Sequence, residues 1–118
     1  MTTPDQPTTI ACNLGAFSTD ERVRHRALIE QLRASVEQIE ELPNGCLFHY
    51  PEESKLLMTA AEFIAMESRC CSFFDFSIEK AAGSSPIRLR VTGPDGAKQI
   101  IMAALSPVGG EPLYGASI

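Results

Sequence analysis

The stretch from residue 42 to residue 51 reads LPNGCLFHYP, and it decides how the chain folds on either side. Helical spacing of apolar residues runs up to it, whereas the residues after the glycine alternate as a β-strand does. An Asn-Gly pair between extended segments favours a hairpin, because both residues tolerate the positive φ that such turns require. We therefore expect a helix that ends near Ser35, a strand over 36–42 and a second strand over 46–50.

On the N-terminal side, Ser18 and Glu21 have the spacing of a capping box, which predicts the start of that helix. A short first strand is expected before it, over residues 8–14. The apolar residues that recur at helical spacing predict the buried face: Val23, Ala27, Leu28, Leu32 and, at the far end, Val36. The basic cluster of the same helix is expected on its solvent face: Arg22, Arg24, His25 and Arg26.

On the C-terminal side, Pro51 closes the strand because it cannot donate into a ladder. A second helix is expected over residues 53–71, with its face on Leu57, Ala60, Ala61, Ile64 and Cys71, and with Phe63, Met66 and Cys70 beside it. The period then changes from helical to alternating, which predicts two strands around 74–79 and 87–92 that place acids opposite arginines. Asp95 is expected to cap a last helix over residues 96–105.

The expected order of elements is β-α-β-β-α-β-β-α. Because the internal strands form hairpins, the sheet of about five strands should be mainly antiparallel, with the helices packed on one face, in an α+β fold. Residues 8–105 are expected to form a single domain. A flexible leader over 1–7 and a flexible tail over 106–118 complete the chain.

Composition excludes several classes of function. A chain of 118 residues is one domain by size, and its formal charge of −5 disfavours nucleic acid and anionic membranes as partners. The N-terminal sequence has no signal-peptide pattern, and no apolar run is long enough to cross a membrane. We therefore expect a cytoplasmic protein. In that compartment thiols stay reduced, so all four cysteines are expected to be free.

Two adjacent cysteines, Cys70 and Cys71, stand within the sequence ESRCCSFFDF at residues 67–76. Neighbours on a regular helix point about 100° apart, so both sulfurs can face one ion only where the helix ends. Thiolates select soft ions such as Cu(I), Zn(II) and Hg(II). Free cysteine also packs in cores as a small hydrophobic residue, so plain core packing is the alternative explanation for the pair.

Other side chains are candidates to assist the pair. Cys12, on the expected first strand, could supply a third ligand, with Cys46 and His49 in reserve. Cys46 alternates with the aromatic residues of its strand and is expected to point inward, whereas His49 is expected on the opposite face. Glu67 stands one helical turn before the pair and could accept a thiol proton, orient a ligand or form a salt bridge with Arg69 or Arg24.

The chain resembles a group of small, largely uncharacterised bacterial proteins. The resemblance is carried by LPNGCLFHYP, by a Cys-x-Leu at Cys12 and Leu14, by the Glu-x-x-Cys-Cys-x-Phe motif that begins at Glu67, and by PIRLRVTGP at residues 86–94. It covers residues 8–105, and it implies a setting of mercury-type metal response. It unites Cys12, Glu67, Cys70 and Cys71 as one candidate constellation, and it implies no reaction.

The sequence therefore predicts a small binding protein that captures a soft metal ion or a thiol-reactive compound through Cys70 and Cys71, with help from Cys12. Hg, Cu(I) and Zn are the candidate ions. An interaction or scaffold domain, such as a homodimer whose cysteines fill the core, is the alternative. A thiol enzyme is less favoured, because the pair is near a helix C-terminus, where the helix dipole disfavours a thiolate.

Overall fold

The computed structural model of the protein describes residues 13–83 and 86–107. Its elements follow in the order η1 (Leu14–Ala16), α1 (Thr19–Ser35), β1 (Gln38–Leu42), β2 (Gly45–Tyr50), α2 (Ser54–Cys70), β3 (Asp75–Lys80), β4 (Ile87–Thr92) and α3 (Ala97–Leu105). The α+β class and the order of the elements from α1 to α3 are as expected.

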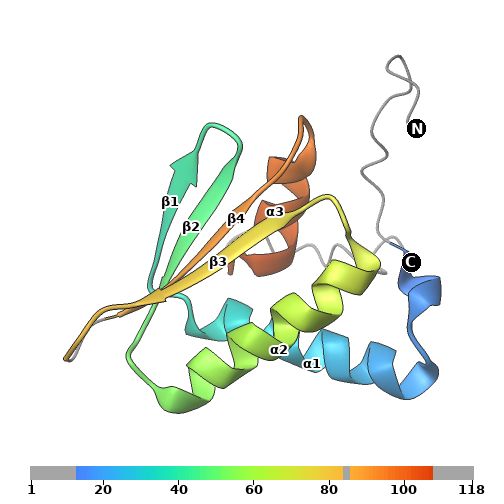
Figure 1. Ribbon diagram of the computed structural model, residues 1–118, viewed down its shortest axis with the longest axis horizontal. Helices are drawn as coiled ribbons and strands as arrows, with labels where there is room; N and C mark the ends of the chain where they lie inside the picture. The colour runs from blue at the N-terminus through green and yellow to red at the C-terminus, as the bar shows by residue number, and fades with distance from the viewer. Residues whose placement is uncertain (1–12, 84–85, 108–118) are drawn as a thin grey trace.

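The described strands form one antiparallel sheet of four strands in the order β1-β2-β4-β3, rather than the expected five. Leu14 belongs to a short 3-10 turn, not to a strand, and residues 8–12 of the expected first strand lie outside the described residues. The expected leader, residues 1–7, and the tail from residue 108 also lie outside them. In Figure 1 the helices lie on one side of the sheet, with α1 beside α2 and α3 against the middle strands.

Helix α1 ends at Ser35, as expected. Strands β1 and β2 form the expected hairpin, but the turn between them differs from the expected one. Leu42 pairs with Gly45, so the two turn residues are Pro43 and Asn44. Gly45 already belongs to β2, and its φ is not positive. A β-carbon at Gly45 would instead collide with the backbone of Val91 on β4. Glycine is therefore required here because two strands approach closely, not because the turn needs a positive φ.

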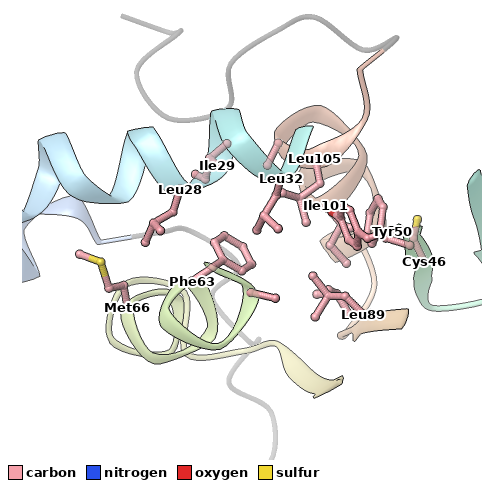
Figure 2. Packing of buried hydrophobic residues seen from close by; sticks show 14 of the residues in the cluster. Leu28, Ile29, Leu32, Cys46, Tyr50, Phe63, Met66, Leu89, Ile101 and Leu105 are labelled. Carbon is pink, nitrogen blue, oxygen red and sulfur yellow. The ribbon is translucent and has the colours of Figure 1, made fainter. Parts of the chain in front are cut away.

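The inner face of the sheet builds the core. Three residues of β2 on this face are fully buried, Cys46, Phe48 and Tyr50, and they stand in register with the buried residues of β4, Val91, Leu89 and Ile87. Figure 2 shows Phe63 of α2 pointing towards Leu28 and Leu32 of α1. Burial of such side chains supplies the main driving force for this fold.

The buried stripe of each long helix differs from the expected stripe. On α1, Val23 is 67% exposed, whereas His25 is 2% exposed and shares the buried face with Leu28, Ile29 and Leu32. On α2 the buried stripe runs one residue earlier than expected, through Leu56, Thr59, Ala60, Phe63, Met66, Glu67 and Cys70. Leu28, Leu32 and Ala60 are buried as expected, but hydrophobicity alone missed His25 and Glu67, the charged or polar members of the two buried faces.

The start of α3 is also different. Gly96, not Asp95, occupies the N-cap, with φ of 92°, and no side chain caps the helix. This left-handed conformation favours glycine, so the position of the turn follows Gly96 rather than the carboxylate beside it.

The outer face of the sheet is mainly polar, with Leu47 as an apolar member, and none of the described helices packs on it. Glu79 and Arg88 stand opposite each other and form an ion pair at 2.5 Å, as the expected pairing of acids with arginines requires. Arg90 faces Ser77 instead. Within the described residues, none of the helices has the length and apolar character that a membrane-spanning helix needs.

Candidate thiol site

The two adjacent cysteines lie where α2 ends. Cys70 is the last residue of the helix, and Cys71 is its C-cap, with an amide that donates a hydrogen bond of 2.6 Å to the carbonyl of Glu67. At Cys71 the backbone leaves the helical region (φ −121°, ψ 80°). The helix end thereby brings the two sulfur atoms to 3.7 Å from each other, although their residues are neighbours in the chain. Both residues are buried, Cys70 at 3% exposure and Cys71 at 0%.

The oxidation state of the pair differs from the expected one. Cys46 and Cys70 are free thiols, but Cys71 takes part in a disulfide bond, so the expectation of four reduced cysteines is wrong for Cys71. The expectation came from the compartment alone, whereas a disulfide depends on which sulfurs the fold brings within bonding distance.

The expected third ligand, Cys12, lies outside the described residues. Among residues 13–83 and 86–107, no group of three or more His, Cys, Asp or Glu side chains is arranged to hold a metal ion. The described part of the site therefore offers the free thiol of Cys70, and it offers the sulfur of Cys71 as a ligand only once the disulfide is reduced.

Glu67 lies beside the cysteines and is paired with a residue that the sequence analysis placed in solvent. Its side chain is 1% exposed, and its Oε1 is 2.5 Å from Nε2 of His25 on α1. Glu67 was expected to pair, if at all, with Arg24 or Arg69; those arginines instead bind Glu62 and Glu21. A signal for His25 was present in the sequence, because it precedes Leu28 by three residues and Leu32 by seven, the spacing of one helix face.

Aromatic rings enclose the His25–Glu67 pair. The imidazole lies 5.0 Å from the ring of Phe17 and 6.3 Å from the ring of Phe63, between centroids. Water is excluded from such surroundings, and a buried ionisable group is stable there only with a partner. The pair therefore links α1 to α2 immediately beside the cysteines, and neither member can be lost without exposing the other to an apolar environment.

The surroundings favour the protonated form of the Cys70 thiol. Burial and, to a lesser extent, the negative charge of Glu67 raise the pKa of Cys70 to about 11, and the backbone amide of Asn13 acts in the opposite sense. A raised pKa leaves very little thiolate at neutral pH, and only the thiolate is nucleophilic. A metal ion would change this balance, because its positive charge favours the deprotonated ligand.

Polar contacts hold residues 13–21 against the end of α2. The amide of Asn13 donates to the carbonyl of Cys70 at 2.8 Å. The guanidinium of Arg69 donates to the carbonyl of Ala16 and to the carboxylate of Glu21, and it lies over the ring of Phe17. The hydrogen bonds from Arg69 hold the pKa of Glu21 at about 2, so this contact persists throughout the neutral range. Residues 13–21 are thus anchored to the last turn of α2, at Arg69 and at Cys70 itself.

The remaining candidates lie elsewhere. Cys46 is buried on the inner face of β2 as expected, with its sulfur 3.3 Å from that of Met102, and burial raises its pKa. His49 lies on the outer face of the sheet, where it pairs with Glu40 at 2.8 Å. Since the helices and the cysteine pair are on the other face, the structure does not bring His49, the reserve ligand, to the pair.

No family model, no curated protein and no solved structure matches this chain. Its function must therefore be argued from the residues of the site.

Proposed function

We propose that Cys70 and Cys71 form a binding site for a soft metal ion or a small thiol-reactive compound. The state that binds is the one in which both cysteines are thiols. Hg(II), Cu(I) and Zn(II) are the candidate ions, because soft thiolate ligands select them.

The observation that carries this proposal is the separation of 3.7 Å between the two sulfur atoms. Two thiolates bound to one tetrahedral ion, each at about 2.3 Å, are about 3.8 Å apart. In the oxidised state that the structure shows, the end of α2 already holds the two sulfurs at about the separation that one shared ion requires. Cys12 remains the candidate for a further ligand.

The surroundings of the pair also suit capture better than catalysis. The raised pKa of Cys70 keeps its thiol unreactive towards ordinary electrophiles at neutral pH. A soft cation competes with the proton for sulfur and releases it on binding. In a metal site the bound ion itself promotes loss of the thiol proton. A catalytic thiol would instead need a neighbouring base or positive charge that lowers its pKa.

A specific observation favours the alternative of an interaction or scaffold domain. Cys70 and Cys71 are as deeply buried as the core leucines, and buried cysteine packs as a small hydrophobic residue. In that case the pair fills space at the end of α2, and the protein acts through a surface, for instance as a homodimer.

Titration of the fully reduced protein under anaerobic conditions separates the two proposals. Hg(II), Cu(I) and Zn(II) are added in turn, and binding is followed by thiolate-to-metal absorption and by native mass spectrometry. The variant with Cys70→Ser and Cys71→Ser tests the site. Cys46→Ser is the matched control, because Cys46 is also a buried free cysteine but lies on the sheet, in contact with Met102.

Binding of one ion per chain that the double variant loses and Cys46→Ser retains would support the metal site. Binding no tighter than that of a free dithiol, or unchanged in the double variant, would contradict it. If the double variant changes only the melting temperature, core packing accounts for the pair.

A further inference from the structure

A second pair of sulfur atoms lies between the sheet and α3, on elements other than the helix that carries Cys70. The thiol of Cys46, on β2, contacts the thioether of Met102, on α3, and the two sulfurs are 3.3 Å apart. Cys46 is a free thiol and is fully buried, whereas Met102 is only partly buried. Two soft donors from different elements therefore lie side by side in a place that the proposed function does not use.

An ion pair lies next to these two sulfurs. Glu41 stands opposite Cys46 on the neighbouring strand β1, and Lys98 precedes Met102 by one turn of α3. The side chains of Glu41 and Lys98 meet at 3.0 Å. Burial raises the pKa of Cys46, Lys98 lowers it and Glu41 raises it, so both charges act on the thiol. The ion pair thus links β1 to α3 at the place where the sulfurs meet.

We propose that Cys46 and Met102 form a second metal site, which binds Cu(I). A thiolate and a thioether are the soft ligands that select this ion. On binding, the S–H bond of Cys46 breaks, a bond forms between its sulfur and the ion, and the proton passes to solvent. The thioether of Met102 donates a lone pair and loses no proton. Copper enters and stays as Cu(I), so no electron is transferred.

The charge of the two ligands selects a monovalent ion. One thiolate and one neutral thioether carry a single negative charge, so bound Cu(I) leaves the ligand set neutral. Zn(II) or Hg(II) would leave a positive charge uncompensated beside the apolar core, and burial of an unpaired charge is costly. Glu41 does not offset that charge, because Lys98 already pairs with it.

The flexibility of methionine lets the site adjust to the ion. Two sulfurs bound at about 2.3 Å to one tetrahedral ion are about 3.8 Å apart, so the sulfurs must separate by about half an ångström. Met102 can make this movement because its side chain has three rotatable bonds, whereas Cys46 belongs to a central strand of the sheet. Met102 is also the partly exposed member of the pair, so the ion reaches the site from its side.

The test follows the methyl groups of isotope-labelled methionines by NMR while Cu(I), buffered by bicinchoninate, is added to reduced protein without oxygen. We expect the Met102 signal, which Met102→Leu identifies by its absence, to shift on binding, and Cys46→Ser to abolish that shift. Met58 is the internal control, because it is 72% exposed on α2 and its signal should not move.

The affinity of the site is measured in the Cys70→Ser and Cys71→Ser background, which removes the other proposed site. Cu(I) should bind to two sites in the wild-type chain, and this background should lose only one of them. Met102→Leu should then weaken binding about 100-fold, because a second linked ligand gains on the order of 10²–10⁴. Leucine replaces methionine in cores at little cost in stability, so this variant should remain folded.

Each outcome decides the matter. A Met102 shift that depends on Cys46, together with weaker binding by Met102→Leu, supports the second site. A Met102 signal that stays in place while Cu(I) binds overturns it. An equal shift with Zn(II) overturns the selection of a monovalent ion. Loss of the shift in the folded Cys70→Ser and Cys71→Ser variant would make Cys46 part of the first site, and it would overturn a separate second one.

Discussion

Two histidine–glutamate pairs of the same chemistry lie in opposite surroundings in this protein. His25 and Glu67 join α1 to α2 in the core, with side chains 3% and 1% exposed. His49 and Glu40 join two strands on the outer face of the sheet, with side chains 15% and 49% exposed. Water solvates the second pair and screens it, whereas apolar rings surround the first.

This difference in surroundings assigns the pairs different roles. A solvated pair contributes little to stability, because water solvates the remaining side chain when its partner is removed. A buried pair costs desolvation energy to form, but the removal of one member leaves the other without compensation. Only the buried pair lies next to Cys70, so only it can influence the thiols.

Glu67→Ala should cause the largest loss of stability among the variants of the two histidine–glutamate pairs. It leaves His25 among aromatic rings without its carboxylate, and we expect a loss of about 3–5 kcal/mol in the free energy of unfolding. Urea denaturation of wild-type and variant protein measures it.

Replacement of the whole buried pair is the control for that result. His25→Leu combined with Glu67→Met should recover most of the loss, since apolar residues of similar size often replace a buried pair at little cost. A loss of less than about 1 kcal/mol in the free energy of unfolding of Glu67→Ala would show that His25 does not depend on Glu67 in the core.

The pH dependence of Cys70 alkylation reports how the surroundings of the buried pair affect the neighbouring thiol. In a Cys46→Ser background, alkylation of native protein should be slow at pH 7 and should rise about tenfold per pH unit towards pH 11, because the thiolate fraction follows the raised pKa. The same raised pKa makes the folded state lose stability as the pH rises from about 8.5, where the unfolded thiol ionises, to about 11.

Glu67→Gln should move that labelling profile to lower pH, because it removes the negative charge that opposes ionisation of Cys70. Glu40→Gln on the outer face should leave the profile in place. A profile unmoved by Glu67→Gln would show that burial alone sets the pKa of Cys70.

His49→Ala should have the smallest effect. We expect a loss of about 0.2–1 kcal/mol, which declines as salt is added, because the pair with Glu40 is partly solvated. Urea denaturation at low and high salt measures this change. A loss comparable to that of Glu67→Ala would abolish the distinction between the two pairs.

Much of the fold was predictable because it depends on local patterns. The capping box at Ser18 and Glu21 forms as expected. Alternating residues predicted β2, β3 and β4, and the turn before Gly45 predicted the hairpin, although the close approach to Val91 that requires this glycine could not be read from the chain. Helix faces were predicted less well, since a scale of hydrophobicity places histidine and glutamate outside.

The sequence by itself determined that two cysteines stand together at a helix end with a carboxylate one turn before them, since these are matters of spacing along the chain. Tertiary structure alone decided that His25 meets Glu67 and that Cys71 is oxidised while Cys70 is not. The physical reason is that pairing, burial and disulfide formation depend on distances between segments far apart in the chain, and local patterns carry no information about those distances.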